Sequence, residues 1–508
     1  MVARVQSYLM QGIDAEPCEV EVDLDDEGLD KQLVVGLPDA AVKESLERVR
    51  TALFNSGFGA VRGKLLVNLA PADVRKQGPD YDLPIALGLL AAQGVIRPVR
   101  DDGGLDLRQF VICGELALDG RVRPVAGVIA MAALAKAKGA KGVIVPSANA
   151  TEAAMVPGLE VHGISTLAEG VGIVNGLIDP SPIGALDVAG LLDTAPALVD
   201  FADVRGQEGV KRAMVVAAAG GHNILMLGPA GTGKTMMAKA LPGILPPLTV
   251  EEALEVTRIY SAAGLLPEGQ GLVTRRPVRS PHHTASSPAI VGGGMIPRPG
   301  EISLAHHGIL FLDELPEFPR IVLETLRQPL EDHVVTIARA HGAVKFPASF
   351  MLVAAMNPTP KGDVAPGEVG RRAMEQYLSR LSGPLLDRID IHVEAPAVPW
   401  KKLAESPRGT STQTMRAQVL AARERQHARQ GNTPNARLTG NQLDVHARMN
   451  DDAKTLLGQA MNELGLSARA YDKIRRVSRT IADLEGAEGV LLPHVAEAVQ
   501  YRLLDRRV

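Results

Sequence analysis

The sequence predicts an α/β protein, and three short apolar runs in its central part carry this prediction. The runs cover residues 223–227, 308–312 and 350–356, and each has the length and composition of a buried parallel strand. The part before them combines β-rich runs at residues 19–24, 32–35 and 64–68 with helical spacing at 40–56, which predicts an α+β domain. The part after residue 405 has helical spacing and predicts a helical domain.

The segment after the first run, residues 228–235, reads GPAGTGKT and has the spacing of a phosphate-binding P-loop. A helix is predicted directly after it, at residues 235–241. The glycines let the backbone wrap closely around phosphate oxygens, and the helix directs its positive end at the same anion. Lys234 is expected to reach the outer phosphates of ATP, and Thr235 to ligate Mg²⁺. The nucleotide-binding residues predicted from the motif are Gly228, Ala230, Gly231, Thr232, Gly233, Lys234 and Thr235.

The other two apolar runs end in polar side chains that complete a site for ATP hydrolysis. The second run leads into Asp313 and Glu314, the pattern of a Walker B strand. Asp313 is expected to enter the Mg²⁺ shell, and Glu314 to orient and polarise the attacking water. The third run ends at Asn357, whose amide is expected to hold the same water or the terminal phosphate.

Two arginines further along the chain are predicted to act on nucleotide phosphates. Arg388 follows an apolar Leu385-Leu386 pair and is expected to reach a nucleotide bound to a neighbouring subunit, which requires a ring. Arg469 lies in the first turn of a predicted helix and is interpreted as a second sensor. Singly, such arginines are more often structural, and their order after the P-loop is what favours catalytic roles.

A β-hairpin is predicted at residues 334–348, inserted just before the third strand. Arg339, His341 and Lys345 are expected near its tip, where they would neutralise DNA phosphates without reading sequence. A solvated hairpin with ordinary surface charges explains the same residues equally well.

Composition sets the broad class of the protein. A chain of 508 residues with 46% apolar residues is long enough for about three globular domains. Aromatic residues make up 3%, which argues against stacking platforms for single-stranded nucleic acid. The two cysteines, Cys18 and Cys113, are too few for a disulfide framework and fit a reducing, cytoplasmic location. No export signal or run of 18 apolar residues is found, so no membrane partner is expected.

Charge is distributed unevenly along the chain. Residues 401–508 hold 18 Lys and Arg against 12 Asp and Glu, so this end carries +6 and the remainder −10. A basic end is compatible with a polyanion partner, although a solvated helical face is the commoner cause.

Two segments near the N-terminus resemble the proteolytic domain of Lon-type proteases. They are QGPDYDLPIALGLLAA from Gln77 and the stretch from Gly114 that ends in GVIVP. The resemblance implies a Lon-like fold, but the serine and lysine of the protease dyad align with Asp80 and Ile129. Neither residue can supply or activate a hydroxyl nucleophile, so no protease activity is expected. Asp80 and Asp82 also fit as turn residues beside Gly78 and Pro79, which is the favoured interpretation.

The order of P-loop, acidic strand end, polar strand end and two arginines resembles that of AAA+ ATPases. Residues 275–318, RRPVRSPHHTASSPAIVGGGMIPRPGEISLAHHGILFLDELPEF, resemble the hallmark stretch of magnesium-chelatase-like ATPases. With the Lon-like domain in front, the whole chain resembles the YifB/ComM group. The resemblance implies a hexameric ATPase linked to DNA branch migration in natural transformation. That group usually carries zinc-binding cysteines after the sensor asparagine, and residues 357–362 contain none, so no zinc is expected.

The resulting prediction is a Lon-like domain at 1–180, a linker at 181–200, an AAA+ core at 201–400 and a helical lid at 405–508. The leading hypothesis for function is a homo-oligomeric, Mg²⁺-dependent ATPase that moves along branched or duplex DNA. A chelatase-type or protein-remodelling ATPase that acts on a partner subunit is the alternative, and an ATP-dependent protease is disfavoured. The pairs His282-His283 and His306-His307 are interpreted as structural or nucleotide-linked rather than as metal ligands.

Overall fold

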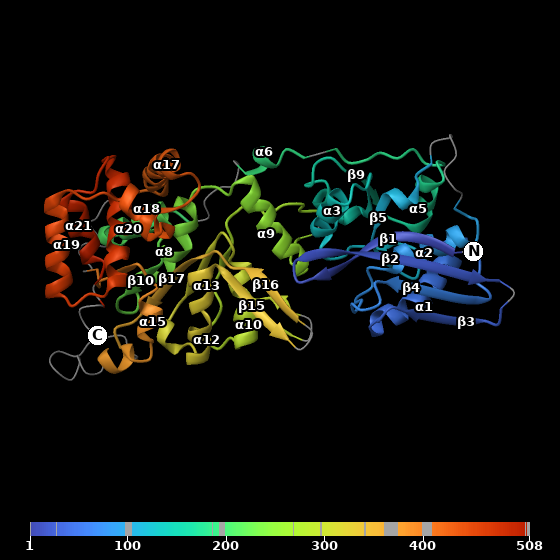
Figure 1. Ribbon diagram of the computed structural model, residues 1–508, viewed down its shortest axis with the longest axis horizontal. Helices are drawn as coiled ribbons and strands as arrows, with labels where there is room; N and C mark the ends of the chain where they lie inside the picture. Colours follow the sequence, from blue (N-terminus) through green and yellow to red (C-terminus); the bar gives the residue numbers. More distant parts are fainter. Residues whose placement is uncertain are drawn as a thin grey trace. The chain divides into compact units, whose positions relative to one another are not determined.

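The computed structural model describes residues 2–26, 28–96, 104–184, 186–192, 199–267, 269–294, 297–339, 342–359, 374–398, 409–502 and 504 (Figure 1). The chain forms two compact units. The first contains residues 1–192 together with 249–274, and the second contains residues 193–248 together with 275–508.

The first unit is built on a mixed sheet with helices on both faces. Its seven strands run in the order β3-β4-β2-β1-β5-β8-β9. Two pairs of neighbouring strands are antiparallel, β1 with β2 and β2 with β4. The other four pairs are parallel: β3 with β4, β1 with β5, β5 with β8, and β8 with β9. The strands are β1 (Val2–Gln11), β2 (Asp14–Asp25), β3 (Lys31–Val35), β4 (Lys64–Ala70), β5 (Phe110–Ile112), β8 (Gly142–Pro146) and β9 (Glu160–Ile164), and a short hairpin joins β6 (Glu115–Leu116) to β7 (Val122–Arg123).

Apolar side chains on the two faces of this sheet contribute to two separate apolar cores. Ile144 in β8 packs with the buried side chains of α1 and α2, whereas its neighbours Val143 and Val145 pack with those of α3 and α4. Successive side chains of a strand point to opposite faces, so one strand serves both cores. The helices of this unit are α1 (Ala40–Asn55), α2 (Asp82–Ala92), α3 (Val128–Ala137), α4 (Ser147–Ala153), α5 (Leu167–Val174), α6 (Val188–Leu192) and α9 (Val250–Ala262).

Helix α9 belongs to the first unit although its sequence lies inside the predicted ATPase core. A capping box between Thr249 and Glu252 starts the helix, and Ala253, Val256 and Ile259 are fully buried. The amide of Gly127, just before α3, donates to Oγ of Ser261 at 2.9 Å. The segment 249–274 is therefore an insertion whose apolar face is part of the N-terminal unit.

The second unit contains a parallel sheet of five strands in the order β11-β14-β17-β10-β18. These strands are β11 (Val278–Arg279), β14 (Ile309–Leu312), β17 (Met351–Met356), β10 (Ile224–Leu227) and β18 (Ile391–Glu394). The three apolar runs of the sequence form β14, β17 and β10, all of them buried. A mixed α/β architecture is thus confirmed.

Helices and hairpins surround this sheet. The helical segments are α7 (Glu208–Gly220), α8 (Lys234–Ala240), η3 (Leu241–Ile244), α10 (Ser287–Val291), α11 (Glu301–Leu304), η4 (Leu315–Glu317), α12 (Arg320–Thr325), α13 (Arg327–Asp332) and α15 (Gly383–Leu386). One hairpin joins β12 (Gly292–Gly293) to β13 (Arg298–Pro299), and the other joins β15 (Val334–Arg339) to β16 (Gly342–Pro347). The second hairpin lies where the sequence predicts it.

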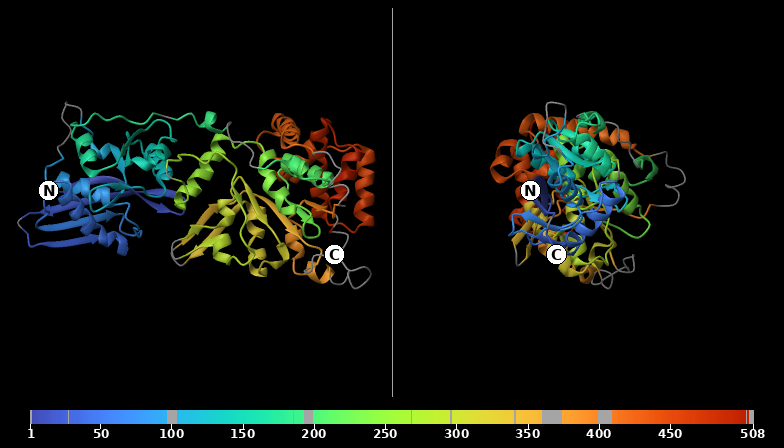
Figure 2. Two further views of the ribbon diagram at one scale, coloured as in Figure 1. Left: turned by 180° about the vertical axis from the view of Figure 1, so that it is seen from behind. Right: turned by 90° about the vertical axis from the view of Figure 1, so that its right-hand side faces the viewer.

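The C-terminal part is helical, as predicted, and its helices group together in the view from behind (Figure 2, left). They are α17 (Thr412–Gln430), α18 (Gly440–His446), α19 (Asp451–Glu463), α20 (Ala468–Glu485) and α21 (Leu492–Gln500). One face of α20 buries Ile474, Val477 and Ile481 in an apolar core that also includes Ile224 of β10. This lid and the sheet therefore share one core.

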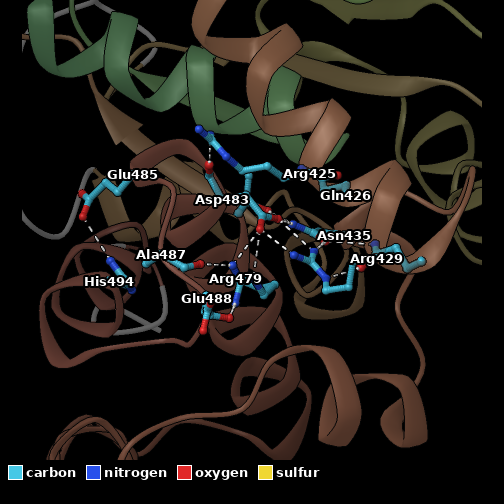
Figure 3. Close-up of polar contacts among 12 residues, drawn as sticks. Arg425, Gln426, Arg429, Asn435, Arg479, Asp483, Glu485, Ala487, Glu488 and His494 are labelled. Carbon is cyan, nitrogen blue, oxygen red and sulfur yellow. Dashed lines mark hydrogen bonds and ion pairs between the residues drawn. The ribbon is translucent and has the colours of Figure 1, made fainter.

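A polar network fastens the lid helices to one another (Figure 3). Asp483 of α20 is fully buried and accepts hydrogen bonds from Arg429 at 2.6 and 2.9 Å, from Arg479 at 2.7 Å and from Asn435 at 2.8 Å. Such a carboxylate is stable in the interior because each of its oxygens is paired.

Among the described residues, no helix combines the length and the apolar character that crossing a membrane requires.

Candidate nucleotide site

The P-loop follows the carboxyl end of β10 and leads into α8. Gly231 and Gly233 have φ of 79° and 85°, in the left-handed region that favours glycine. A Cβ at Gly228 would lie 2.1 Å from the carbonyl oxygen of Ala395, so this position admits no side chain. Built Cβ atoms at Gly231 and Gly233 meet nothing within 4 Å, which leaves open space beside the loop.

The side chain of Lys234 is folded back into this loop. Its Nζ donates to the carbonyl oxygens of Gly228 at 2.6 Å and Pro229 at 2.7 Å, and to Oδ1 of Asn357 at 3.1 Å. Burial lowers the pKa of the Lys234 ammonium, and the nearby Asp313 carboxylate opposes that shift. The loop thus already holds a cation at the position where the outer phosphates of a nucleotide would lie.

Thr235 and Asp313 provide adjacent oxygens at the carboxyl edge of the sheet. Thr235 Oγ1 donates to Asp313 Oδ2 at 2.7 Å, although the two residues come from α8 and from the end of β14. A hydroxyl beside a carboxylate suits Mg²⁺, which prefers oxygen ligands and usually takes only one or two carboxylates. Together with the open glycine loop and the Lys234 ammonium, this pair fits a bound Mg²⁺–triphosphate.

Glu314 has an unusual backbone conformation next to this pair. Its φ is 52°, and its amide donates to Asp313 Oδ1 at 3.0 Å. A positive φ in a non-glycine residue is uncommon, and such residues cluster at functional sites. Glu314 Oε2 lies 3.4 Å from Nδ1 of His283, which stacks on His282 with ring centroids 4.1 Å apart. Of the two histidine pairs, this one contacts the predicted water-activating carboxylate.

Gln207 borders the P-loop from the segment just before α7. It is buried, and its Nε2 donates to the carbonyl oxygens of Thr232 at 3.2 Å and Pro396 at 2.9 Å. The amide therefore connects the P-loop to the end of β18, and α7 begins only at Glu208.

Arg388 lies at the opposite edge of the sheet from its own P-loop. Its carbonyl oxygen accepts a hydrogen bond of 3.1 Å from Asn223, the residue before β10, whereas the P-loop comes after β10. The guanidinium donates to the carbonyl oxygen of Pro384 at 2.7 Å and pairs with Glu331, and 18% of the side chain is exposed. Arg388 is therefore directed away from the nucleotide site of its own chain and is restrained by a carboxylate.

Arg469 lines the same pocket as Arg388. Its Nη1 lies 3.8 Å from Asp387, and 65% of its side chain is exposed. The pocket measures about 360 Å³ and is also lined by Arg437, Lys473 and Arg476. The structure thus brings both predicted arginines together, apart from Lys234, Asp313, Glu314 and Asn357.

The β15–β16 hairpin carries the three residues predicted to contact DNA, and among them the structure describes the side chain of Lys345 alone. Lys345 is exposed but lies opposite Thr336 within the β15–β16 ladder rather than at the turn. Arg339 is the last residue of β15, and its side chain, like the whole of His341, lies outside the described residues. Residues 360–373 after Asn357 also lie outside them, so the zinc prediction stays a prediction.

In the first unit, the two positions that align with the serine and lysine of a protease dyad hold Asp80 and Ile129. Burial, Asp82 and Glu115 raise the pKa of Asp80 to about 7. Ile129 is buried in the first turn of α3, and its amide donates to Glu152 at 2.8 Å. Neither residue is a serine or a lysine, so the described geometry offers no Ser-Lys pair at these positions.

Several residues of the site had not been recognised in the sequence. Glu331 pairs with Arg388, yet its own sequence context carries no motif. His283 was interpreted as structural or nucleotide-linked, but its contact with Glu314 was not predicted. Lys473 offers a weak signal, because it follows Arg469 by one helical turn on α20.

Comparison with known proteins identifies the family. A family model described as magnesium chelatase, subunit ChlI, matches residues 200–403, and models of subunit ChlI and of its C-terminal part match residues 20–149 and 409–502. Competence protein ComM of Haemophilus influenzae is 44% identical over 99% of this chain and 98% of its own length. Protein YifB of Escherichia coli is 42% identical over 97% of this chain and 96% of its own length. The magnesium-chelatase 38 kDa subunit of Rhodobacter capsulatus is 26% identical over 33% of this chain and 52% of its own length. The chain therefore belongs to the ComM/YifB family of magnesium-chelatase-like AAA+ ATPases.

Proposed function

We propose that this chain hydrolyses ATP in a ring of identical subunits, each site being shared by two of them. The proposal is supported by the placement of the predicted phosphate-binding and magnesium-binding residues at one edge of the sheet and of the two arginines at the other. Lys234, Thr235 and Asp313 gather at its carboxyl edge, whereas Arg388 and Arg469 line a pocket at its amino edge. Side chains at opposite edges of one subunit meet only when a second copy presents its amino edge to the first.

In this shared site each residue has a definite task. Lys234 and the P-loop amides bind the outer phosphates, and Glu314 orients a water for in-line attack. Mg²⁺ held by Thr235 and Asp313 would neutralise charge on the phosphoryl oxygens. Asn357 positions the terminal phosphate, and the partner copy's arginines stabilise the charge that develops in the transition state. A hexamer in the cytoplasm is the assembly that the family resemblance implies.

We further propose that this ATPase works on branched or duplex DNA. Support comes from the relative named a competence protein, from the excess of 6 positive charges in residues 401–508, and from the exposed Lys345 on the β15–β16 hairpin. Contacts of this kind bind phosphates irrespective of sequence and weaken steeply with salt.

One experiment tests both parts of the proposal. ATP turnover of the full chain is measured with and without a synthetic four-way DNA junction, while strand displacement is followed on the same junction. DNA-stimulated turnover together with displacement supports the proposal. Turnover that ignores DNA, without displacement, contradicts the DNA part and leaves the ATPase part standing.

The alternative is a chelatase-type or remodelling ATPase that drives a partner subunit, which the partial match to the 38 kDa chelatase subunit favours. It uses the same ATPase residues. The N-terminal unit, for which we propose a Lon-like fold without protease activity, does not separate the two hypotheses, because a model described as subunit ChlI of Mg-chelatase matches residues 20–149 within it. Co-purification of a tetrapyrrole-binding partner would reverse the ranking.

A further inference from the structure

The loop that carries Arg388 and the helix that carries Arg469 are joined by a buried ion pair. Asp390 lies two residues after Arg388, and its Oδ1 is 2.9 Å from Nζ of Lys473 on α20. Lys473 follows Arg469 by four residues, so the two side chains lie on one face of the helix. The ion pair thus connects the loop that carries Arg388 to the helix that carries Arg469.

The surroundings of Asp390 leave its carboxylate little freedom. Its Oδ2 accepts from the amide of Asn223 at 3.3 Å and lies 3.3 Å from Nδ1 of His222. The other ring nitrogen of His222 is 2.8 Å from Oγ1 of Thr480, also on α20. Asp390 and Lys473 are each 7% exposed, and His222 is fully buried. Asp390 is therefore connected to α20 twice, directly through Lys473 and indirectly through His222 and Thr480.

The backbone of the loop is fastened as well. Asn223 Nδ2 donates to the carbonyl oxygen of Arg388 at 3.1 Å, and Arg502 Nη1 donates to that of Ile389 at 2.7 Å. Arg502 is 1% exposed. Because the loop is held from the sheet and from the C-terminal end of the lid, a shift of α20 would move Arg388 and Arg469 together.

The energetics favour a role of this ion pair in geometry rather than in stability. Burial alone raises the pKa of Asp390, but the Lys473 charge and the contact with His222 outweigh burial and leave the pKa below its usual range. Attraction inside a protein is largely offset by the loss of hydration of both charges, so a buried pair adds little net stability. What such a pair supplies is a definite arrangement of the elements that it joins.

We propose that Asp390 and Lys473 are positioning residues that set Arg388 and Arg469 at a defined separation, ready for the triphosphate of a neighbouring copy. The inference rests on the proposed shared site. Through this junction between core and lid, a movement of the lid displaces the two arginines that would stabilise the transition state. Such a displacement matters because a misplacement of about 1 Å costs about 100-fold in rate.

The test removes both charges of the pair in the full chain. Asp390→Asn combined with Lys473→Met leaves no unpaired buried charge, whereas either change alone would. We expect an unchanged KM for ATP and a kcat lower by about 100-fold. Lys473→Arg keeps the charge on a differently shaped head group, and we expect it to lower kcat at constant KM as well; it serves as the test if the double variant does not fold.

Subunit mixing separates positioning from a merely structural role. The double variant retains an intact P-loop edge, and Lys234→Ala retains an intact arginine edge. Mixed rings should therefore regain turnover above the sum of the two separate proteins. A folded double variant that regains nothing on mixing would overturn the inference.

The matched control is the ion pair of Arg212 on α7 with Glu497 on α21, at 2.9 and 3.1 Å. It also joins core to lid but leads to neither arginine, so Arg212→Met with Glu497→Gln should keep the wild-type kcat. Arg388→Ala is the reference for the shared site. If Arg388→Ala lowers turnover while the Asp390/Lys473 variants keep it, the positioning role is wrong and the shared site stands. If Arg388→Ala itself has no effect, the shared site fails.

Discussion

Lys234 and Asn357 are joined by a hydrogen bond of 3.1 Å between Nζ and Oδ1, although one follows β10 and the other follows β17. The bond places the amide beside the ammonium at the carboxyl edge of the sheet. The Asn357 side chain therefore lies beside the ammonium that is predicted to bind the outer phosphates.

Replacing Asn357 tests this location. Asn357→Ala should leave the Kd for ATP nearly unchanged but lower kcat by about 100-fold, the typical cost of one lost donor to transition-state charge. Fluorescent-nucleotide titration and steady-state turnover give the two values. Lys234→Ala is the contrast, because it should abolish nucleotide binding itself, and equal losses of binding in both variants would contradict the assignment.

Glu314→Gln should bind ATP without hydrolysing it. The amide keeps the size of the carboxylate and its approach to His283, but it cannot accept the proton of the attacking water. Nucleotide binding and a single-turnover assay measure the effect. Normal turnover in this variant would show that another group activates the water.

Glu331→Gln should make Arg388 more available to a neighbouring copy. Glu331 pairs with Arg388 and is 60% exposed, so the pair contributes at most about 1 kcal/mol. We therefore expect the protein concentration for half-maximal turnover to fall by no more than about fivefold. A lower kcat at saturating protein concentration would instead make Glu331 a support of Arg388.

Asp80 should make the stability of the protein depend on pH. Its pKa is about 7 in the folded chain against 3.8 as the ordinary value, so between these values the folded state binds more protons than the unfolded state. The contribution of Asp80 to the free energy of unfolding is therefore fully present below pH 3.8. It falls as pH rises and is lost above about pH 7. Asp80→Asn should flatten this part of the profile and raise Tm at pH 8, as measured by thermal unfolding of both proteins from pH 4 to 8. A parallel profile in the variant would show that Asp80 is not the titrating group.

Ser261→Ala should weaken the attachment of α9 within the first unit. Ser261 Oγ donates to Glu152, a carboxylate that is 4% exposed and whose pKa burial raises. Loss of that donor should cost about 1–3 kcal/mol, because a buried acceptor is left with fewer partners. Urea unfolding gives the change. Glu251→Gln on the exposed side of the same helix should stay within about 0.5 kcal/mol, and an equal loss in both variants would contradict the attachment.

Local sequence patterns predicted the elements well. The helical spacing at residues 40–56 corresponds to α1 (Ala40–Asn55), and the β-rich runs at 19–24, 32–35 and 64–68 lie within β2, β3 and β4. The strand–loop–helix of the P-loop and the acidic end of β14 were also recognisable. These features depend on side-chain periodicity and on glycine geometry, both of which are properties of short segments.

The membership of α9 and the pocket of Arg388 and Arg469 were not predictable in this way. Helix α9, Val250–Ala262, has an ordinary amphipathic pattern, and nothing in that pattern says that its apolar face is covered by the N-terminal unit. Periodicity shows that a face is buried but not by which element.

By itself the sequence determined the family, the type of each main element and the residues at the carboxyl edge of the central sheet. Only the tertiary structure decided that Arg388 and Arg469 share one pocket, that Asp390 and Lys473 connect their supports, and that Glu331 and His283 hold two of the predicted catalytic side chains. The physical reason is that a motif is a spacing along the chain, whereas an ion pair between distant segments depends on how whole helices pack against a sheet.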